Sequence, residues 1–165
     1  MRHPQADAEF SPNAALFREF DSATATKLVR LGIEAGFEPE QLIFREHDDS
    51  GQFFYITSGS IALEQSTTDH SIRIQTLHEG DFLGWSALLG SGTRHFQARA
   101  LTPVSLLTFD GEFLHRKCED DPLFGYVLMK RLLLLVTERL DAARGQLAES
   151  RRGEVGDWDT GSTSH

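Results

Sequence analysis

Residues 80–100 read GDFLGWSALLGSGTRHFQARA, a stretch that combines adaptable backbone positions, a short apolar run and a cation. Gly80 and Gly84 permit backbone angles that a side chain forbids, and residues 85–89 are long enough for one or two helical turns. The first N–H groups of such a turn have no internal partner and therefore act as outward donors. Arg94 follows with a guanidinium whose shape suits two phosphate oxygens. The stretch predicts an anion-binding unit that leads into a strand.

Short strand-like runs flank this unit and are separated by turn residues. They comprise residues 42–44, 53–56, 61–63, 72–74, 96–100 and 104–109. Strands of this length and spacing favour an antiparallel jelly roll or barrel, which shortens or removes exposed sheet edges. A helix is expected over 13–20, and a second one, capped by Asp21 or Ser22, is expected to carry Leu28, Leu31 and Ile33.

Two parts of the sequence resemble the cyclic nucleotide-binding domain family, which includes catabolite gene activator-type regulators and protein kinase A regulatory subunits. The stretch 52–63 is similar to the family's strand–glycine–strand hairpin, with Gly59 at its turn. The residues that match the family's phosphate-binding cassette are Gly80, Asp81, Gly84 and Arg94. The resemblance covers about residues 40–147. It implies a mainly β fold with flanking helices, in which an antiparallel β jelly roll is followed by a long C-terminal dimerisation helix.

The sequence departs from the family pattern at three positions. Trp85 replaces the Glu that binds the ribose 2′-hydroxyl, His95 replaces a small residue after the arginine, and His47 stands at a turn glycine. Trp85 is compatible with stacking on a ligand, with plugging a former pocket, or with ordinary core packing. The alternatives for Arg94 and His95 are a surface arginine and a structural histidine. The predicted ligand-binding residues are Gly84, Trp85, Ser86, Arg94 and His95, with Gly59 and Gly80 as structural glycines.

A long helix is expected after the roll. A short helix over 111–119 precedes a start signal at residues 120–122, and the long helix runs from Leu123 to about Ala148. One apolar stripe of this helix has the 4-3-4-3-4 spacing of a two-stranded coiled coil and predicts a homodimer. Its members are Met129, Leu133, Val136, Leu140, Ala143 and Leu147. The alternative is a buried core helix.

Composition sets the remaining expectations. The 165 residues suit one domain over 13–149, between disordered tails at 1–12 and 150–165. The single cysteine, Cys118, cannot form an internal disulfide, and neither a signal-peptide core nor an apolar stretch of the roughly 20 residues that span a bilayer is present. We therefore expect a cytoplasmic protein without a membrane partner. The net charge of −9 and the lack of a helix-turn-helix pattern predict no direct nucleic-acid binding.

No catalytic or metal motif stands out in the sequence. A cupin-type metal site needs a His-x-His pair, which does not occur, and Ser86 lacks the second glycine of a nucleophile elbow. We expect no enzyme activity, no metal and no cofactor other than a cyclic nucleotide as ligand.

Two functions compete. In the first, the chain is a stand-alone cyclic nucleotide-binding-like sensor that binds a phosphorylated small molecule, cAMP or cGMP above others, and signals through its long helix to an unidentified protein. In the second, it is a dimeric interaction module of the same fold that has lost its nucleotide. Arg94 favours the first and Trp85 the second.

Overall fold

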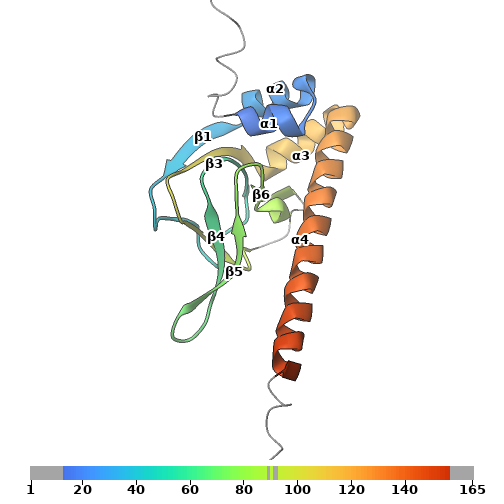
Figure 1. The fold of residues 1–165 in the computed structure, drawn as a ribbon. Coiled ribbons are helices and arrows are strands. Elements are labelled where there is room, and N and C mark those ends of the chain that lie inside the picture. The colour runs from blue at the N-terminus through green and yellow to red at the C-terminus, as the bar shows by residue number, and fades with distance from the viewer. Residues whose placement is uncertain (1–12, 89, 91–92, 157–165) are drawn as a thin grey trace, which may run out of the picture. The chain divides into compact units, whose positions relative to one another are not determined.

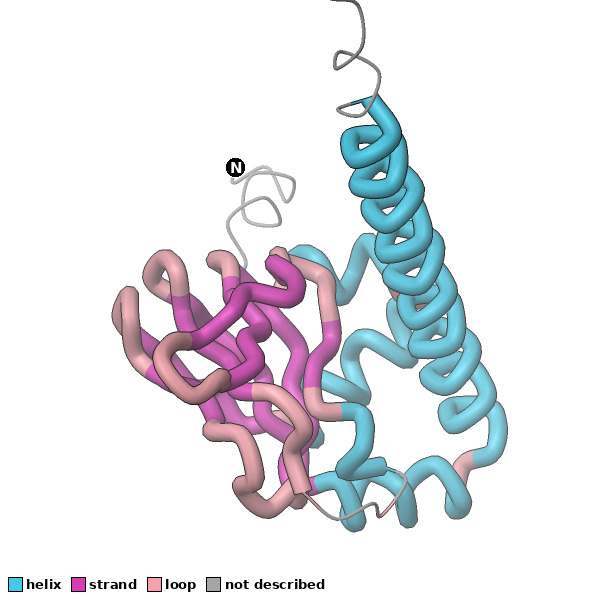
Figure 2. Tube along the Cα trace, turned by 90° about the horizontal axis from the view of Figure 1, so that it is seen from below, coloured by secondary structure: helices cyan, strands magenta, loops and turns pink. Residues whose placement is uncertain are grey.

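Two four-stranded antiparallel sheets form the body of the protein in the computed structural model, which describes residues 13–88, 90 and 93–156 (Figure 1). The first sheet has the order β1 (Ile33–Phe37), β8 (Val104–Asp110), β3 (Gln52–Ser58) and β6 (Phe82–Leu83). The second has the order β2 (Leu42–Phe44), β7 (Gln97–Ala100), β4 (Ile61–Ser66) and β5 (Ser71–Leu77). Figure 2 shows the strands gathered in one body. The predicted antiparallel roll is confirmed.

The interior of the roll is filled from both sheets. Along β3 the side chains alternate, so that Phe54 and Ile56 point into the same core while Phe53 and Tyr55 point away from it. The buried members of the core are Phe54, Ile56, Ile61, Leu77, Leu83, Ala98, Ala100, Val104 and Leu106. The small residues Ala98 and Ala100 lie on β7, the strand that follows Arg94.

The other face of the first sheet carries a second, aromatic layer. Phe82 lies 5.0 Å from Phe53 and 4.7 Å from Tyr55, measured between ring centroids. Phe20, which follows helix α1 (Ala14–Glu19), meets Phe82 edge-on at 6.1 Å. Helices α1 and α2 (Ser22–Leu31) lie at one end of the roll (Figure 1). Strand β3 is therefore buried on both faces.

Aspartates cap the main helices, as the sequence predicts for Asp21 and for the start signal at residues 120–122, and Asp110 is a further cap. The Asp21 carboxylate accepts the N–H of Thr24 at 3.1 Å, and this side-chain and backbone bonding to Thr24 lowers the pKa of Asp21. Asp110 caps α3 (Gly111–Asp120) through the N–H of Phe113 at 2.8 Å. Asp121 accepts from Phe124 at 3.2 Å at the start of α4 (Pro122–Gly156).

The predicted second helix ends earlier than expected, and two strands were missed. Ile33 is not helical: α2 ends at Leu31, and Ile33 begins β1 opposite Thr108 of β8. The two-residue strand β6 pairs Phe82 with Tyr55. Both strands exist because of long-range pairing, which overrides local periodicity.

Helix α4 runs to Gly156, beyond the predicted end near Ala148 and into the predicted tail. Residues 149–152 are adequate helix formers, and the cost of Gly153 is about 1 kcal/mol. The described residues divide into two compact units at the Val127–Leu128 boundary, inside α4. The predicted tails at 1–12 and 157–165 lie outside the described residues. None of the described helices is long and apolar enough to cross a membrane.

The predicted seam of α4 is exposed. Leu133, Leu140 and Leu147 are 67%, 51% and 61% exposed, and Met129 and Val136 are also exposed. Leu128, Leu132 and Leu135, which lie beside the seam, are at most 7% exposed. The helix therefore presents an apolar stripe that nothing covers within the described chain.

Candidate functional site

The glycine turn between β6 and the next element packs directly against Arg94. Gly84 has a φ of +78°, and a Cβ atom there would lie 2.5 Å from Arg94 Nη1 and 2.8 Å from the Gln52 carbonyl oxygen. Only glycine fits this position without strain. Trp85 and Ser86 follow on the short 3₁₀ helix η1 (Trp85–Leu88), where both are half-buried.

Arg94 is buried, with 4% of the residue exposed. Its Nη2 donates to the Gln52 carbonyl, whereas Nε and Nη1 have no hydrogen-bond partner among the described residues. Burial lowers the pKa of Arg94, and the charges of Asp48 and Asp49 oppose that shift. Because an arginine keeps its charge even so, this site holds a desolvated cation with unused donors.

Two aromatic rings flank the guanidinium. The Arg94 Cζ atom lies 4.5 Å from the centroid of Phe44 and 5.7 Å from that of Phe54. The two rings stack on each other, with centroids 5.8 Å apart and planes inclined by 22°. Contact between the cation and the ring faces offsets part of the cost of burial.

The backbone of Arg94 is fixed by the turn at residues 45–49. The His47 N–H donates to the Arg94 carbonyl at 2.9 Å, and the Arg94 N–H donates to the Asp48 carbonyl, also at 2.9 Å. His47 has a φ of +72°, a conformation that favours glycine. Although histidine replaces the family's glycine here, the turn keeps a glycine-like backbone.

The predicted structural glycines also adopt positive φ angles. Gly59, at the β3–β4 turn, has a φ of +89°, and a Cβ atom there would meet Val104 Cγ2 at 2.9 Å. Gly80 has a φ of +90°, and its N–H donates to the Ile56 carbonyl at 2.9 Å. The Ile56 N–H in turn donates to the Asp81 carbonyl at 2.9 Å, which ties the start of the cassette to β3.

The structure brings together some of the predicted site residues. Gly84 and Arg94 are in contact, whereas the side chain of His95 is exposed. Sequence reasoning missed Gln52, Phe44 and Phe54, which surround the guanidinium. The pairing of Phe44 with Ala98 places Phe44 near the start of β7, which follows Arg94, but this register cannot be read from the sequence.

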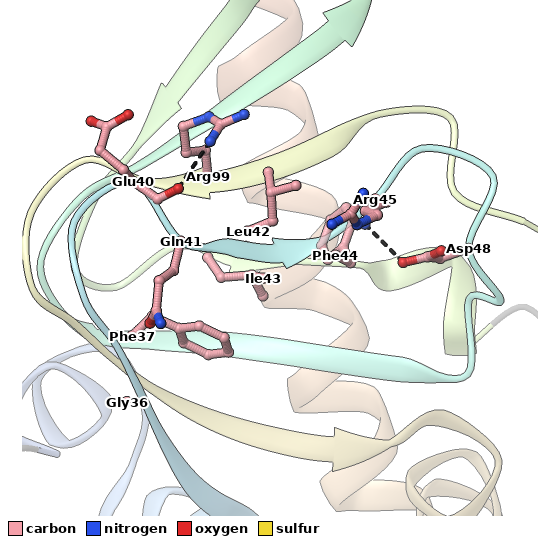
Figure 3. Close-up of a pocket in the computed structure, with 10 residues that line it drawn as sticks. All are labelled: Gly36, Phe37, Glu40, Gln41, Leu42, Ile43, Phe44, Arg45, Asp48 and Arg99. Carbon is pink, nitrogen blue, oxygen red and sulfur yellow. Dashed lines mark hydrogen bonds between the residues drawn. The ribbon is translucent and has the colours of Figure 1, made fainter.

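A separate pocket of about 680 Å³ opens beside β2 (Figure 3). Its wall includes Phe37, Phe44 and Arg99. Arg99 forms an ion pair with Glu64 at 2.9 Å and donates to the Glu40 carbonyl at 2.9 Å, so its guanidinium is already engaged. Phe44 and Asp48 both line this pocket and contact Arg94, Phe44 through its ring and Asp48 through its carbonyl oxygen.

The described residues contain no group of three or more His, Cys, Asp or Glu side chains that could hold a metal ion. Cys118 is half-buried, and burial raises the pKa of its thiol, which reduces the reactive thiolate at neutral pH.

Comparison with known proteins gives one family. The profile of the cyclic nucleotide-binding domain matches residues 35–121. The cGMP-dependent protein kinase egl-4 of Caenorhabditis elegans is 29% identical over 116 residues, which make up 67% of this chain and 14% of the kinase. The chain thus corresponds to a small part of that relative.

Two solved structures illustrate the fold. A cyclic nucleotide-binding domain from Methylobacillus flagellatus KT superposes with a TM-score of 0.72 and 16% identity, covering 79% of this chain and 74% of that one. The catabolite activator protein of Thermus thermophilus gives a TM-score of 0.65 and 21% identity, covering 86% of this chain and 63% of that one.

Proposed function

This chain belongs to the cyclic nucleotide-binding domain family, and we propose that it is a regulatory domain that binds a phosphorylated small molecule, with cAMP or cGMP as the ligand. The relatives support this choice, since one is named a cGMP-dependent kinase and another a catabolite activator. In the proposal Arg94 and the turn from Gly84 to Ser86 hold the phosphate, and His95 lies at the rim.

The observation that carries the proposal is the environment of Arg94. A buried cation is costly unless it is paired, and the Arg94 guanidinium has a single hydrogen bond among the described residues, to a neutral carbonyl. An anionic ligand would supply the missing charge and acceptors. The burial of Arg94 thus makes the site better suited to a phosphate than to a neutral ligand.

Trp85 makes the proposed site differ from the family pattern at the position of the ribose contact. An indole has no acceptor for a ribose hydroxyl, so the family's ribose contact is absent from this position. We therefore expect recognition to depend mainly on the phosphate, with weaker selection for the 2′-hydroxyl than the family's Glu provides.

The test is a calorimetric titration of cAMP and cGMP into the wild type, Arg94→Met and Trp85→Glu. Arg94→Met removes the charge and keeps the apolar stem, so it should weaken binding by about 1.5 to 3 kcal/mol, roughly tenfold to more than a hundredfold. The melting temperature should hold or rise, because replacing a buried charge by an apolar side chain is often neutral or stabilising. Binding that is lost without unfolding marks a ligand-binding residue.

Trp85→Glu tests the ribose contact, with 2′-deoxy-cAMP as the matched control ligand. The variant should gain affinity for cAMP and not for the deoxy compound. If none of the three proteins binds either nucleotide, the nucleotide proposal is refuted.

Signalling requires that the ligand favour one arrangement of α4. We infer a coupling of about 1 to 3 kcal/mol between the ligand site and the helix, the usual range for such a link. The exposed stripe on α4 suits a second copy of the chain, so a homodimer is part of the proposal.

The same stripe favours a second candidate function. A dimeric interaction module without a ligand would also use Leu133, Leu140 and Leu147, which are more than half exposed. The titrations separate the two candidates. Nucleotide binding by the wild type would support the ligand-binding domain, whereas binding that appears only in Trp85→Glu would support the interaction module, in which Trp85 fills the former nucleotide pocket.

A further inference from the structure

Arg94 is held by a ring that comes from a distant part of the sequence. Phe44 lies on β2, and its ring centroid is 4.5 Å from the Arg94 Cζ atom. Phe54 of β3 stacks on Phe44 and supports it from within the core cluster. Both rings lie outside the stretch 80–100 that contains Gly84 and Arg94.

The two contacts to the guanidinium restrain different motions. A ring face against a planar guanidinium fixes the plane of the cation, and the Gln52 carbonyl that accepts from Nη2 fixes its rotation within that plane. Neither contact uses Nε or Nη1. Gly84 leaves room for the group, since a Cβ atom there would reach Nη1.

We propose that Phe44 is a positioning residue for anion binding. Its ring holds the Arg94 guanidinium in the buried slot, where Nε and Nη1 have no hydrogen-bond partner among the described residues, and so it sets the affinity for the phosphate group. The affinity part of this inference rests on the proposed function, whereas the positioning part concerns the unliganded protein.

Three variants separate this role from ordinary core packing. Phe44→Leu keeps an apolar side chain and loses the ring, and Phe44→Tyr keeps the ring. Phe37→Leu is the matched control, because Phe37 is also half-buried against the roll core and lines the same pocket, yet no cation lies over its ring in the described structure (Figure 3). Melting temperatures of the two leucine variants check that both fold.

The first measurement needs no ligand. A ring face shifts the NMR signals of protons above it upfield, so the Arg94 side-chain protons should be shifted in the wild type, in Phe44→Tyr and in Phe37→Leu. In Phe44→Leu the shift should fall to the smaller part that comes from Phe54, whose ring centroid lies 5.7 Å from the Arg94 Cζ atom. An unchanged spectrum in folded Phe44→Leu would overturn the inference.

The second measurement is the affinity for cAMP and cGMP. Loss of a desolvated cation–ring contact should weaken binding about 2- to 30-fold in Phe44→Leu, with Phe44→Tyr close to the wild type. Equal losses in Phe44→Leu and Phe37→Leu would make Phe44 an ordinary core residue and refute the inference. If the wild type binds neither nucleotide, the proposed function fails, and the chemical shifts alone decide whether Phe44 positions Arg94.

Discussion

Replacing Gly84 by alanine should damage the domain through two separable effects. The first is the backbone, because a φ of +78° costs a residue with a side chain roughly 1 to 2 kcal/mol. The second is steric, because the new Cβ atom would lie 2.5 Å from Arg94 Nη1 and 2.8 Å from the Gln52 carbonyl oxygen. Overpacking of this kind costs about 1 to 3 kcal/mol. The sum is about 2 to 5 kcal/mol of unfolding free energy.

Other glycines of the chain supply controls for each effect. Gly90 has a φ of +65° and nothing within 4 Å of an added Cβ atom, so Gly90→Ala isolates the backbone cost. Gly51 has neither a positive φ nor a close neighbour, so Gly51→Ala should change stability little. Urea unfolding followed by circular dichroism should rank the losses as Gly84→Ala, then Gly90→Ala, then Gly51→Ala.

The difference between the losses of unfolding free energy in Gly84→Ala and Gly90→Ala measures the steric effect alone. In an Arg94→Met background the contact with Nη1 disappears while the contact with the Gln52 backbone remains, so this difference should shrink without vanishing. Equal losses for Gly84→Ala and Gly90→Ala would show that Arg94 does not pack against the glycine turn, and the description of the site would be wrong.

Three further predictions concern the dimer, the 45–49 turn and acid stability. Val136→Asp combined with Leu140→Asp should give a monomer in sedimentation analysis, and a wild type that is already monomeric at tens of micromolar, roughly the scale at which a short seam associates, would refute the dimer. His47→Gly should raise stability by up to about 1 kcal/mol, since relief of the left-handed φ exceeds the entropy cost of glycine; a lower melting temperature would contradict this reasoning. The hydrogen bond from Lys27 lowers the pKa of Asp121, so its stabilising effect is complete above the unfolded pKa of about 3.9 and is lost as the pH falls through the folded pKa. The melting temperature of Asp121→Asn should therefore lie below that of the wild type at neutral pH, and the gap should narrow in acid; a gap that is constant with pH would count against the pair.

The fold and part of the site could be predicted from the sequence because their signals are local. The capping aspartates, the strand alternation of Phe54 and Ile56, and the glycine turn before Arg94 each depend on a few neighbouring residues. The strands β1 and β6 could not be found this way, since each is defined by its partner strand. Phe44 and Gln52 could not be predicted as neighbours of Arg94 either, because they meet it only through the pairing of strands that are distant in the sequence.

The conformation of His47 shows a different limit. Its place at a family glycine position identifies the turn, but the sequence does not tell whether a residue with a side chain reshapes the loop or accepts its backbone angles. The hydrogen bonds between this turn and the Arg94 backbone answer the question, because they hold the glycine-like form against the strain.

The burial of β3 on both faces depends on elements that lie far from it in the sequence. Residues 52–58, QFFYITS, contain no charge, proline or glycine, and five of them are buried in the folded domain. A segment of this composition is prone to amyloid-like association when it is uncovered. The aromatic layer that includes Phe53 and Tyr55 is covered in part by Phe20 and α1, which are synthesised before β3. The N-terminal helices therefore cover part of an aggregation-prone segment, and we expect a version of the domain that lacks them to be less soluble.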